Sequence, residues 1–220
     1  MPGPAAVRFD ATQPLSGRVA VLPSAFNPPT IAHLHLLERA LAVTGVTQAA
    51  ALLSTRNVAK GVVGAGLADR VGMLMAAREE ADWLAVLAVN AARLVDQAAA
   101  LTAGFPGAEF DFIVGFDTLV RLFDRVYYDE MERELAPFFA RHRVIATNRG
   151  DADIEQVRAF VKTDAGAFAE RIIAVEIDER AASLSSTAAR EAAAVGNDVD
   201  HVPDAVLAYM RRRRLYVGAD

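Results

Sequence analysis

The chain has 220 residues, 53% of them hydrophobic, which is enough for one sizeable domain with its own core. It has no cysteine, so disulfides and thiolate metal sites are excluded, and its formal net charge of −5 argues against a nucleic-acid partner. Charges or glycines interrupt every apolar run before it reaches the roughly 20 residues of a membrane span. Residues 1–17 lack the apolar core of a secretory signal, so we expect a flexible lead-in to a cytoplasmic protein whose single domain covers 18–220.

From residue 18 onward, short apolar runs alternate with stretches of helical spacing. In chain order, the predicted strands cover 18–22, 49–53, 83–89, 110–114, 143–146 and 171–177. The predicted helices cover 31–43, 67–80, 91–101, 117–123, 129–139, 153–161, 186–194 and 203–213. This alternation predicts an α/β, Rossmann-like doubly wound parallel sheet with a C-terminal helical segment. Ligands of such folds lie beyond the carboxyl ends of the strands.

The loop between the first strand and the first helix, residues 24–33, reads Ser-Ala-Phe-Asn-Pro-Pro-Thr-Ile-Ala-His. A helix that begins there presents free backbone N–H groups and the positive end of its dipole, which suits a phosphate. Thr30 and His33 are three residues apart, so they lie on the same side of the first turn and could both donate to that phosphate. The residues alone leave open that Thr30 is only a helix cap and His33 a partly buried histidine.

A second loop, near the end of the chain, carries three consecutive hydroxyl residues, Ser185, Ser186 and Thr187, before an alanine-rich helix. Either serine can cap that helix, and its N–H groups can hold a second phosphate. Arg190 returns to the same face four residues after Ser186 and could bind an anion through both guanidinium nitrogens. The alternative is a capped surface helix with a solvated arginine.

The two loops together resemble the signatures of the nucleotidylyltransferase superfamily. The pattern G-[ST]-F-[DN]-P…[HT]-x-x-H is matched at Phe26, Asn27, Pro28, Thr30 and His33. Ser24 replaces the usual glycine, and Ala25 replaces the usual serine or threonine. Residues 184–190 fill every specified position of [IL]-S-S-T-x-x-R, the motif of the branch that adenylates nicotinamide or nicotinate mononucleotide. The resemblance continues to Tyr216 and covers residues 18–216.

The resemblance implies that the chain binds ATP and transfers its AMP moiety to a pyridine mononucleotide, releasing pyrophosphate. It places His33 and Thr30 at the α- and β-phosphates, and Lys60 and Arg190 on the triphosphate. The ATP contacts that it implies are Ala25, Phe26, Asn27, Gly115, Asp117, Ser185, Ser186 and Thr187. Mg²⁺ would arrive with ATP, bridging phosphate oxygens largely without protein carboxylates.

Some of these positions also have a simpler structural interpretation. Lys60 could be a solvated lysine of a loop that contains glycines, and Asp117, which we expect at the ATP ribose, could cap the helix that it opens. Trp83 and Tyr127 are candidates to stack on the acceptor ring, although a tryptophan at a strand start is more often part of the core. Two other functions stay open: a transferase acting on phosphopantetheine or using CTP, and a nucleotide-binding relative with weak or no catalysis.

Overall fold

A computed structural model describes residues 3–10, 13–55, 64–148, 152–178, 185–197 and 199–217. Its strands are β1 (Ala6–Arg8), β2 (Gly17–Ser24), β3 (Val46–Ser54), β4 (Leu84–Val89), β5 (Ala108–Gly115), β6 (Arg143–Thr147) and β7 (Ile172–Val175). Its α-helices are α1 (Ile31–Leu41), α2 (Leu67–Ala77), α3 (Leu94–Gly104), α4 (Phe116–Leu122), α5 (Met131–Arg141), α6 (Ile154–Asp164), α8 (Ser186–Ala194) and α9 (Asp204–Arg213). Two 3-10 turns, η2 (Arg125–Tyr127) and η3 (Gly166–Arg171), join them.

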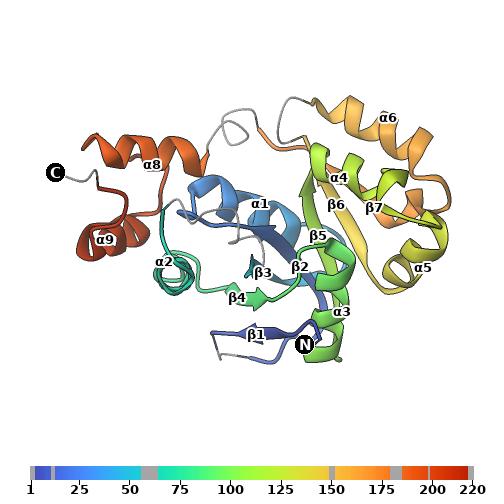
Figure 1. Cartoon of the computed structure of the whole chain (residues 1–220), viewed down its shortest axis with the longest axis horizontal. Coiled ribbons are helices and arrows are strands. Elements are labelled where there is room, and N and C mark those ends of the chain that lie inside the picture. The colour runs from blue at the N-terminus through green and yellow to red at the C-terminus, as the bar shows by residue number, and fades with distance from the viewer. Residues whose placement is uncertain are drawn as a thin grey trace.

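The described strands form one sheet in the order β1-β4-β3-β2-β5-β6-β7 (Figure 1). Every neighbouring pair is parallel except β1 with β4. From β2 the chain moves outward to β3 and β4, then crosses back to β5 and continues to β6 and β7 on the other side. The direction reverses between β2 and β5, which is where doubly wound sheets bind their ligands. The predicted α/β fold is therefore confirmed.

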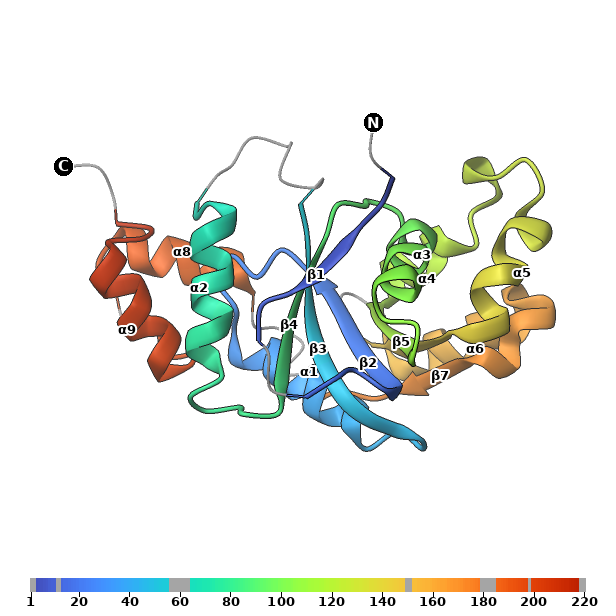
Figure 2. The same cartoon turned by 90° about the horizontal axis from the view of Figure 1, so that it is seen from below.

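Two hydrophobic cores cover the two faces of this sheet. Along β2, Val19 and Val21 belong to the core that contacts α3, α4, α5 and α6, whereas Ala20 and Leu22 belong to the core under α1, α2, α8 and α9. All six residues of β4 are buried. Figure 2 shows the sheet between these two groups of helices. Because both faces are covered, the strands consist of almost uninterrupted apolar residues, which is why they could be recognised in the sequence.

Within the lead-in expected for residues 1–17, Ala6–Arg8 form strand β1 and are part of the sheet, which corrects the expectation of a flexible segment there. β1 pairs antiparallel with β4, and Ala6 lies opposite Val89. Asp10 is 3% exposed and accepts a hydrogen bond from the Val86 N–H at 2.6 Å. Burial alone would raise the pKa of Asp10, but hydrogen bonds from Arg8 and Val86 and the charges of Arg8 and Arg78 hold it below its ordinary value. A three-residue edge strand held by a buried carboxylate leaves no periodic pattern to recognise.

The predicted C-terminal helical segment is present as α8 and α9, and α9 packs along α2. The Tyr209 hydroxyl lies 3.2 Å from the Asp69 carboxylate, and Arg213 forms an ion pair with the same carboxylate at 3.0 Å. After α9 the chain turns through Arg214 and Tyr216, both with positive φ, and Tyr216 packs against the core under α1 and α2. None of the helices in the described ranges is both long and apolar enough to cross a bilayer.

Candidate active site

The loop from β2 to α1 is held in an unusual backbone conformation. Phe26 has a φ of 44°, in the left-handed region that a bulky residue adopts only at a cost, and the Asn27–Pro28 peptide bond is cis. The Phe26 side chain is 1% exposed, and its ring centroid lies 4.9 Å from that of His33. Burial of this ring therefore holds the loop in place, and only the backbone of Phe26 is available to a nucleotide.

Thr30 and His33 are joined directly at the start of α1. Thr30 is the N-cap residue, and its N–H donates to Nδ1 of His33 at 3.0 Å, while its Oγ1 lies 2.8 Å from the same nitrogen. Since a backbone N–H can only donate, Nδ1 is the acceptor, and a neutral imidazole then carries its proton on Nε2. That Nε2 lies 3.1 Å from the Ser24 hydroxyl. The imidazole is thus oriented as a hydrogen-bond donor toward the end of β2, and Thr30 is both a cap and part of this arrangement.

Helix α8 docks on this loop with the residues of the second motif. The Ser186 hydroxyl donates to the Pro28 carbonyl at 2.7 Å, and a terminal nitrogen of Arg190 donates to the Asn27 carbonyl at 2.7 Å. The other terminal nitrogen of Arg190 donates to the Thr187 hydroxyl at 3.1 Å, and Ser185 caps the helix by accepting from the Ala188 N–H at 3.1 Å. The fold therefore brings the β2–α1 loop and helix α8 into contact, although Asn27 and Arg190 are 163 residues apart in the sequence.

Tyr216, known from the sequence only as the end of the resemblance, is a residue of this site. Its hydroxyl donates to Oδ1 of Asn27 at 2.6 Å, and the Ala65 N–H donates to the same oxygen at 3.1 Å. Burial raises the pKa of Tyr216, against the nearby charges of Arg70 and Arg190, so the phenol stays protonated and acts as a donor. Gly64 has a φ of 102°, and a Cβ there would lie 2.8 Å from the Asn27 side chain, so this contact requires glycine.

Arg70 adds a second cation beside Arg190. It is 6% exposed, and its Nε donates to the Ala65 carbonyl at 2.7 Å. Burial lowers the pKa of Arg70, and the positive charge of Arg190 lowers it further. In the described ranges neither guanidinium forms an ion pair with a carboxylate. The site thus carries positive charge that is not neutralised by neighbouring acids, which suits a polyphosphate.

A cavity of about 400 Å³ lies beyond the carboxyl end of β2, between the start of α3 and helix α4. Its lining residues are Pro23, Ala92, Arg93, Leu94, Val95, Gln97, Thr118, Arg121, Leu122, Tyr127 and Tyr128. Tyr127 is 56% exposed at its rim. The Tyr128 hydroxyl donates to the Leu122 carbonyl at 2.8 Å, which fixes the second tyrosine against α4. An apolar cavity with a few polar groups is the usual form of a small-molecule pocket.

Residues 21–192 match the family model described as Cytidylyltransferase-like, which is more than half of the chain. The chain belongs to the cytidylyltransferase-like family. A protein of Schizosaccharomyces pombe named "Putative nicotinamide mononucleotide adenylyltransferase" is 32% identical over 135 residues, which are 60% of this chain and 53% of that protein. The chain thus spans about half the length of this curated relative.

Two solved structures of the Plasmodium falciparum nicotinic acid mononucleotide adenylyltransferase resemble the chain. The complex with APC is 15% identical, covers 91% of this chain and 97% of that one, and has a TM-score of 0.69. The complex with NaAD is 16% identical, covers 90% of this chain and 97% of that one, and has a TM-score of 0.68. At this level of identity the likeness shows a shared fold.

Four other residues were predicted to contact ATP: Ala25, Gly115, Asp117 and Lys60. Ala25 is exposed at the end of β2. Gly115 is the N-cap of α4 and Asp117 is exposed in its first turn, so the interpretation of Asp117 as the cap is wrong. Lys60 lies outside the described residues.

Trp83 is not brought to this site. It precedes β4 at the amino end of the strand and packs against the core under α1 and α2. The six residues of β4 separate Trp83 from the carboxyl edge of the sheet by roughly 20 Å, at about 3.3 Å per residue. Trp83 was predicted to contact the acceptor, but it packs against the core instead. Tyr127, which lines the cavity, remains the aromatic candidate for stacking on the acceptor ring.

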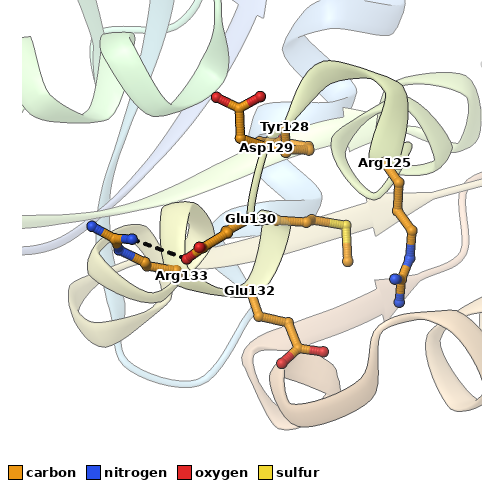
Figure 3. Close-up of a pocket in the computed structure, with 7 residues that line it drawn as sticks. Arg125, Tyr128, Asp129, Glu130, Glu132 and Arg133 are labelled. Carbon is orange, nitrogen blue, oxygen red and sulfur yellow. Dashed lines mark hydrogen bonds and ion pairs between the residues drawn. The ribbon is translucent and has the colours of Figure 1, made fainter.

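A second cavity, of about 420 Å³, lies at the turn between η2 and α5. It is lined by Arg125, Tyr128, Asp129, Glu130, Met131, Glu132 and Arg133. Figure 3 shows that Asp129 points away from Glu132 and Arg125, while Glu130 is paired with Arg133 at 3.0 Å.

Proposed function

We propose that the chain transfers the AMP moiety of ATP to a pyridine mononucleotide and releases pyrophosphate. The observation that carries this proposal is the direct contact between the β2–α1 loop and the start of α8. Ser186 bonds the Pro28 carbonyl, and Arg190 bonds the Asn27 carbonyl. The cavity lined by Pro23 of β2 and by residues around α3 and α4 leaves room for an acceptor. The names of the relatives in fission yeast and Plasmodium support the same reaction, on the nicotinamide and nicotinic acid forms respectively.

In the proposed reaction, an oxygen of the acceptor phosphate attacks the α-phosphorus of ATP, and the bond from that phosphorus to the β-phosphate oxygen breaks. No general base is needed because the attacking phosphate is already anionic. Catalysis then depends on holding the two phosphates in line and on neutralising charge that develops on the α- and β-phosphates.

His33 supplies an Nε2–H donor for this charge, and Thr30 fixes the tautomer that provides it. Arg190 and Arg70 face the β- and γ-phosphates, with the hydroxyls of Ser185, Ser186 and Thr187 at the N-terminus of α8. Asp117 accepts from the ATP ribose, and Ala25, Asn27 and Gly115 approach the nucleotide through their backbone. Lys60 is assigned to the triphosphate because the family resemblance implies a lysine in that role at this place in the chain.

The side chains proposed to contact the phosphates are hydroxyls, an imidazole, guanidiniums and the Lys60 ammonium, while the Asp117 carboxylate is assigned to the ribose, and the described residues contain no cluster of three His, Asp or Glu side chains that could hold a metal. This donor set fits Mg²⁺ that is carried by the phosphate oxygens of ATP. Bound in this way, Mg²⁺ neutralises phosphate charge, and the residues of the chain orient the two substrates.

A pyrophosphate-release assay tests the proposal. The protein is supplied with Mg-ATP and, in turn, nicotinamide mononucleotide, nicotinate mononucleotide, phosphopantetheine or glycerol 3-phosphate, and each product is identified by mass. The same panel with Mg-CTP tests the nucleotide. We expect a dinucleotide from at least one pyridine acceptor. Formation of dephospho-coenzyme A or a cytidylyl product, with neither pyridine dinucleotide detected, would overturn the proposed acceptor, and no release with any acceptor would overturn the activity.

A further inference from the structure

Ser24, the last residue of β2, is partly exposed at the carboxyl edge of the sheet. Side chains alternate along a strand, so Ser24 points to the same face as Ala20 and Leu22, which is the face that α1 covers. Its Oγ lies 3.1 Å from Nε2 of His33. Within the described ranges this hydroxyl has no other hydrogen-bond partner. Ser24 therefore has one polar contact inside the protein and capacity for a second.

The direction of the hydrogen bond between Ser24 and His33 is fixed by the other nitrogen of the ring. The Thr30 N–H donates to Nδ1 at 3.0 Å, so the proton of the neutral imidazole is on Nε2. Nε2 is then the donor and the Ser24 oxygen the acceptor, which leaves the hydroxyl proton of Ser24 for another acceptor. Hydrogen bonds in a chain polarise one another, so a hydroxyl that accepts from an N–H is itself a stronger donor.

His33 is less accessible to a ligand than Ser24. Thr30 is 0% exposed and His33 is 1% exposed, and the imidazole lies against the buried ring of Phe26. Ser24 is partly exposed, and Ala25, the next residue, is exposed. Exposure therefore increases from Thr30 through His33 to Ser24. A ligand that arrives from solvent can meet the hydroxyl without displacing a buried ring.

Much of the backbone donor capacity at the start of α1 is already used inside the protein. The Ile31 N–H donates to the His201 carbonyl at 3.0 Å, and the His33 N–H donates to the Thr30 carbonyl at 3.0 Å. Ala25 has no hydroxyl. A phosphate at this end of β2 must therefore be met largely by side chains, and Ser24 carries a proton that is still available.

We propose that the Ser24 hydroxyl donates directly to the α-phosphate of ATP and that His33 acts through it. The Nε2–H of His33 donates to the Ser24 oxygen, and the Ser24 O–H donates to a non-bridging oxygen of the α-phosphate, where negative charge develops during the transfer. Ser24 is then a catalytic residue, and His33 is a positioning residue that orients and polarises the hydroxyl. This inference rests on the proposed function and refines the contact that the proposed function assigns to His33.

A double-mutant cycle tests this arrangement. We measure kcat at saturating Mg-ATP and acceptor for the wild type, Ser24→Ala, Ser24→Thr, His33→Ala and the double variant Ser24→Ala/His33→Ala. Ser24→Ala should lower kcat by about 10², the loss of one donor at a developing charge, and Ser24→Thr should keep most of the activity. Because the two groups act in series, the double variant should be no slower than the slower single variant. Ser54→Ala is the matched control at the end of β3, since the Ser54 hydroxyl already donates to the Ala91 carbonyl at 2.7 Å; its kcat should stay near that of the wild type.

The possible outcomes separate the inference from the proposed function. An unchanged kcat in Ser24→Ala, losses that multiply in the double variant, or an equal loss in Ser24→Thr would each overturn the role of Ser24 while the adenylyl transfer stands. A lower KM for ATP in Ser24→Ala would also overturn it, because the hydroxyl would then compete with the phosphate for His33.

If the wild type forms no dinucleotide, the proposed function fails, and calorimetric titration with Mg-ATP alone decides the inference. Binding that is roughly tenfold weaker in Ser24→Ala, but not in Ser24→Thr or Ser54→Ala, would support the contact between the Ser24 hydroxyl and a phosphate. Equal affinities in the wild type and Ser24→Ala would overturn it.

Discussion

At the scale of single residues, the proposed function assigns its most specific chemical role to His33. Its Nδ1 is occupied by Thr30, so only Nε2 can donate to a phosphate. We expect His33→Ala to lower kcat by about 10²–10³, the usual loss for one donor at a developing charge. The variant also leaves the buried Thr30 N–H unpaired, so its folding must be verified by circular dichroism before kcat is measured.

His35 provides the control for this variant. It lies on the same helix, is half-buried, and takes no part in the contacts of the β2–α1 loop. His35→Ala should keep a kcat near that of the wild type. A folded His33→Ala protein with unchanged kcat would show that the imidazole does not act on the reacting phosphates.

Arg190 holds the β2–α1 loop through the Asn27 carbonyl, and we propose that it also binds the nucleotide. We expect Arg190→Ala to raise KM for ATP more than KM for the acceptor, because the proposed function assigns its guanidinium to the triphosphate and because it bonds the Asn27 carbonyl. Arg190→Lys should restore only part of the loss, since lysine lacks the planar fork that bonds Asn27 and Thr187 together. Steady-state measurement of both KM values checks this, and an effect confined to the acceptor would place Arg190 in the other pocket.

At the scale of secondary-structure elements, the segment after α9 fastens the β2–α1 loop. Tyr216 is a positioning residue, since its hydroxyl holds the Asn27 side chain and does not need to contact ATP. Tyr216→Phe removes one buried hydrogen bond, which costs about 1 kcal/mol. We expect a several-fold rise in KM for ATP with a smaller change in kcat, measured at saturating acceptor.

Tyr209→Phe is the matched control for that prediction. Tyr209 lies on α9 and its hydroxyl contacts Asp69 of α2, away from Asn27. Both variants lose one phenolic hydroxyl, but only Tyr216→Phe should change KM for ATP. Equal changes in the two variants would mean that the hydroxyls act through general stability of the C-terminal segment.

At the scale of the whole molecule, one buried histidine makes the free energy of unfolding depend on pH. His142 is 3% exposed among Phe110, Phe112 and Phe138, and its Nδ1 accepts from the Phe110 N–H at 3.1 Å. Burial, with the charges of Arg141 and Arg18 and against those of Glu109, lowers its pKa from 6.5 to about 4. Because the folded-state pKa is depressed, the stabilisation is complete above pH 6.5 and is lost as the pH falls toward 4.

Urea denaturation at pH values on both sides of this window tests the prediction. The wild type should lose free energy of unfolding between pH 6.5 and pH 4. His142→Asn keeps a side-chain acceptor for the Phe110 N–H but does not titrate, so its curve should be flatter in this window. Asp10 stabilises the folded state above its ordinary pKa of 3.8, and this contribution is lost only as the pH falls through its lowered pKa, below the window of His142. Identical slopes for the two proteins would contradict the assignment to His142.

The sequence by itself determined the features that depend on local chemistry. Strands buried on both faces appear as continuous apolar runs, and helices that begin after proline or hydroxyl residues mark their own N-termini. The fold class and the starts of α1 and α8 were therefore predicted, whereas phosphate binding at these two helix ends stays a prediction. The cap at Thr30 was also anticipated, because a cap is set by the residues next to it.

Only the tertiary structure decided the contacts between distant segments. Tyr216 meets Asn27 across 189 residues, and no periodicity in the sequence relates the two. Trp83 carries an aromatic ring suited to either a pocket or a core, and the direction of β4 put it at the end away from the site. Ala6–Arg8 pair with β4, so the backbone groups at the edge of β4 find their partners in a segment far away in the sequence.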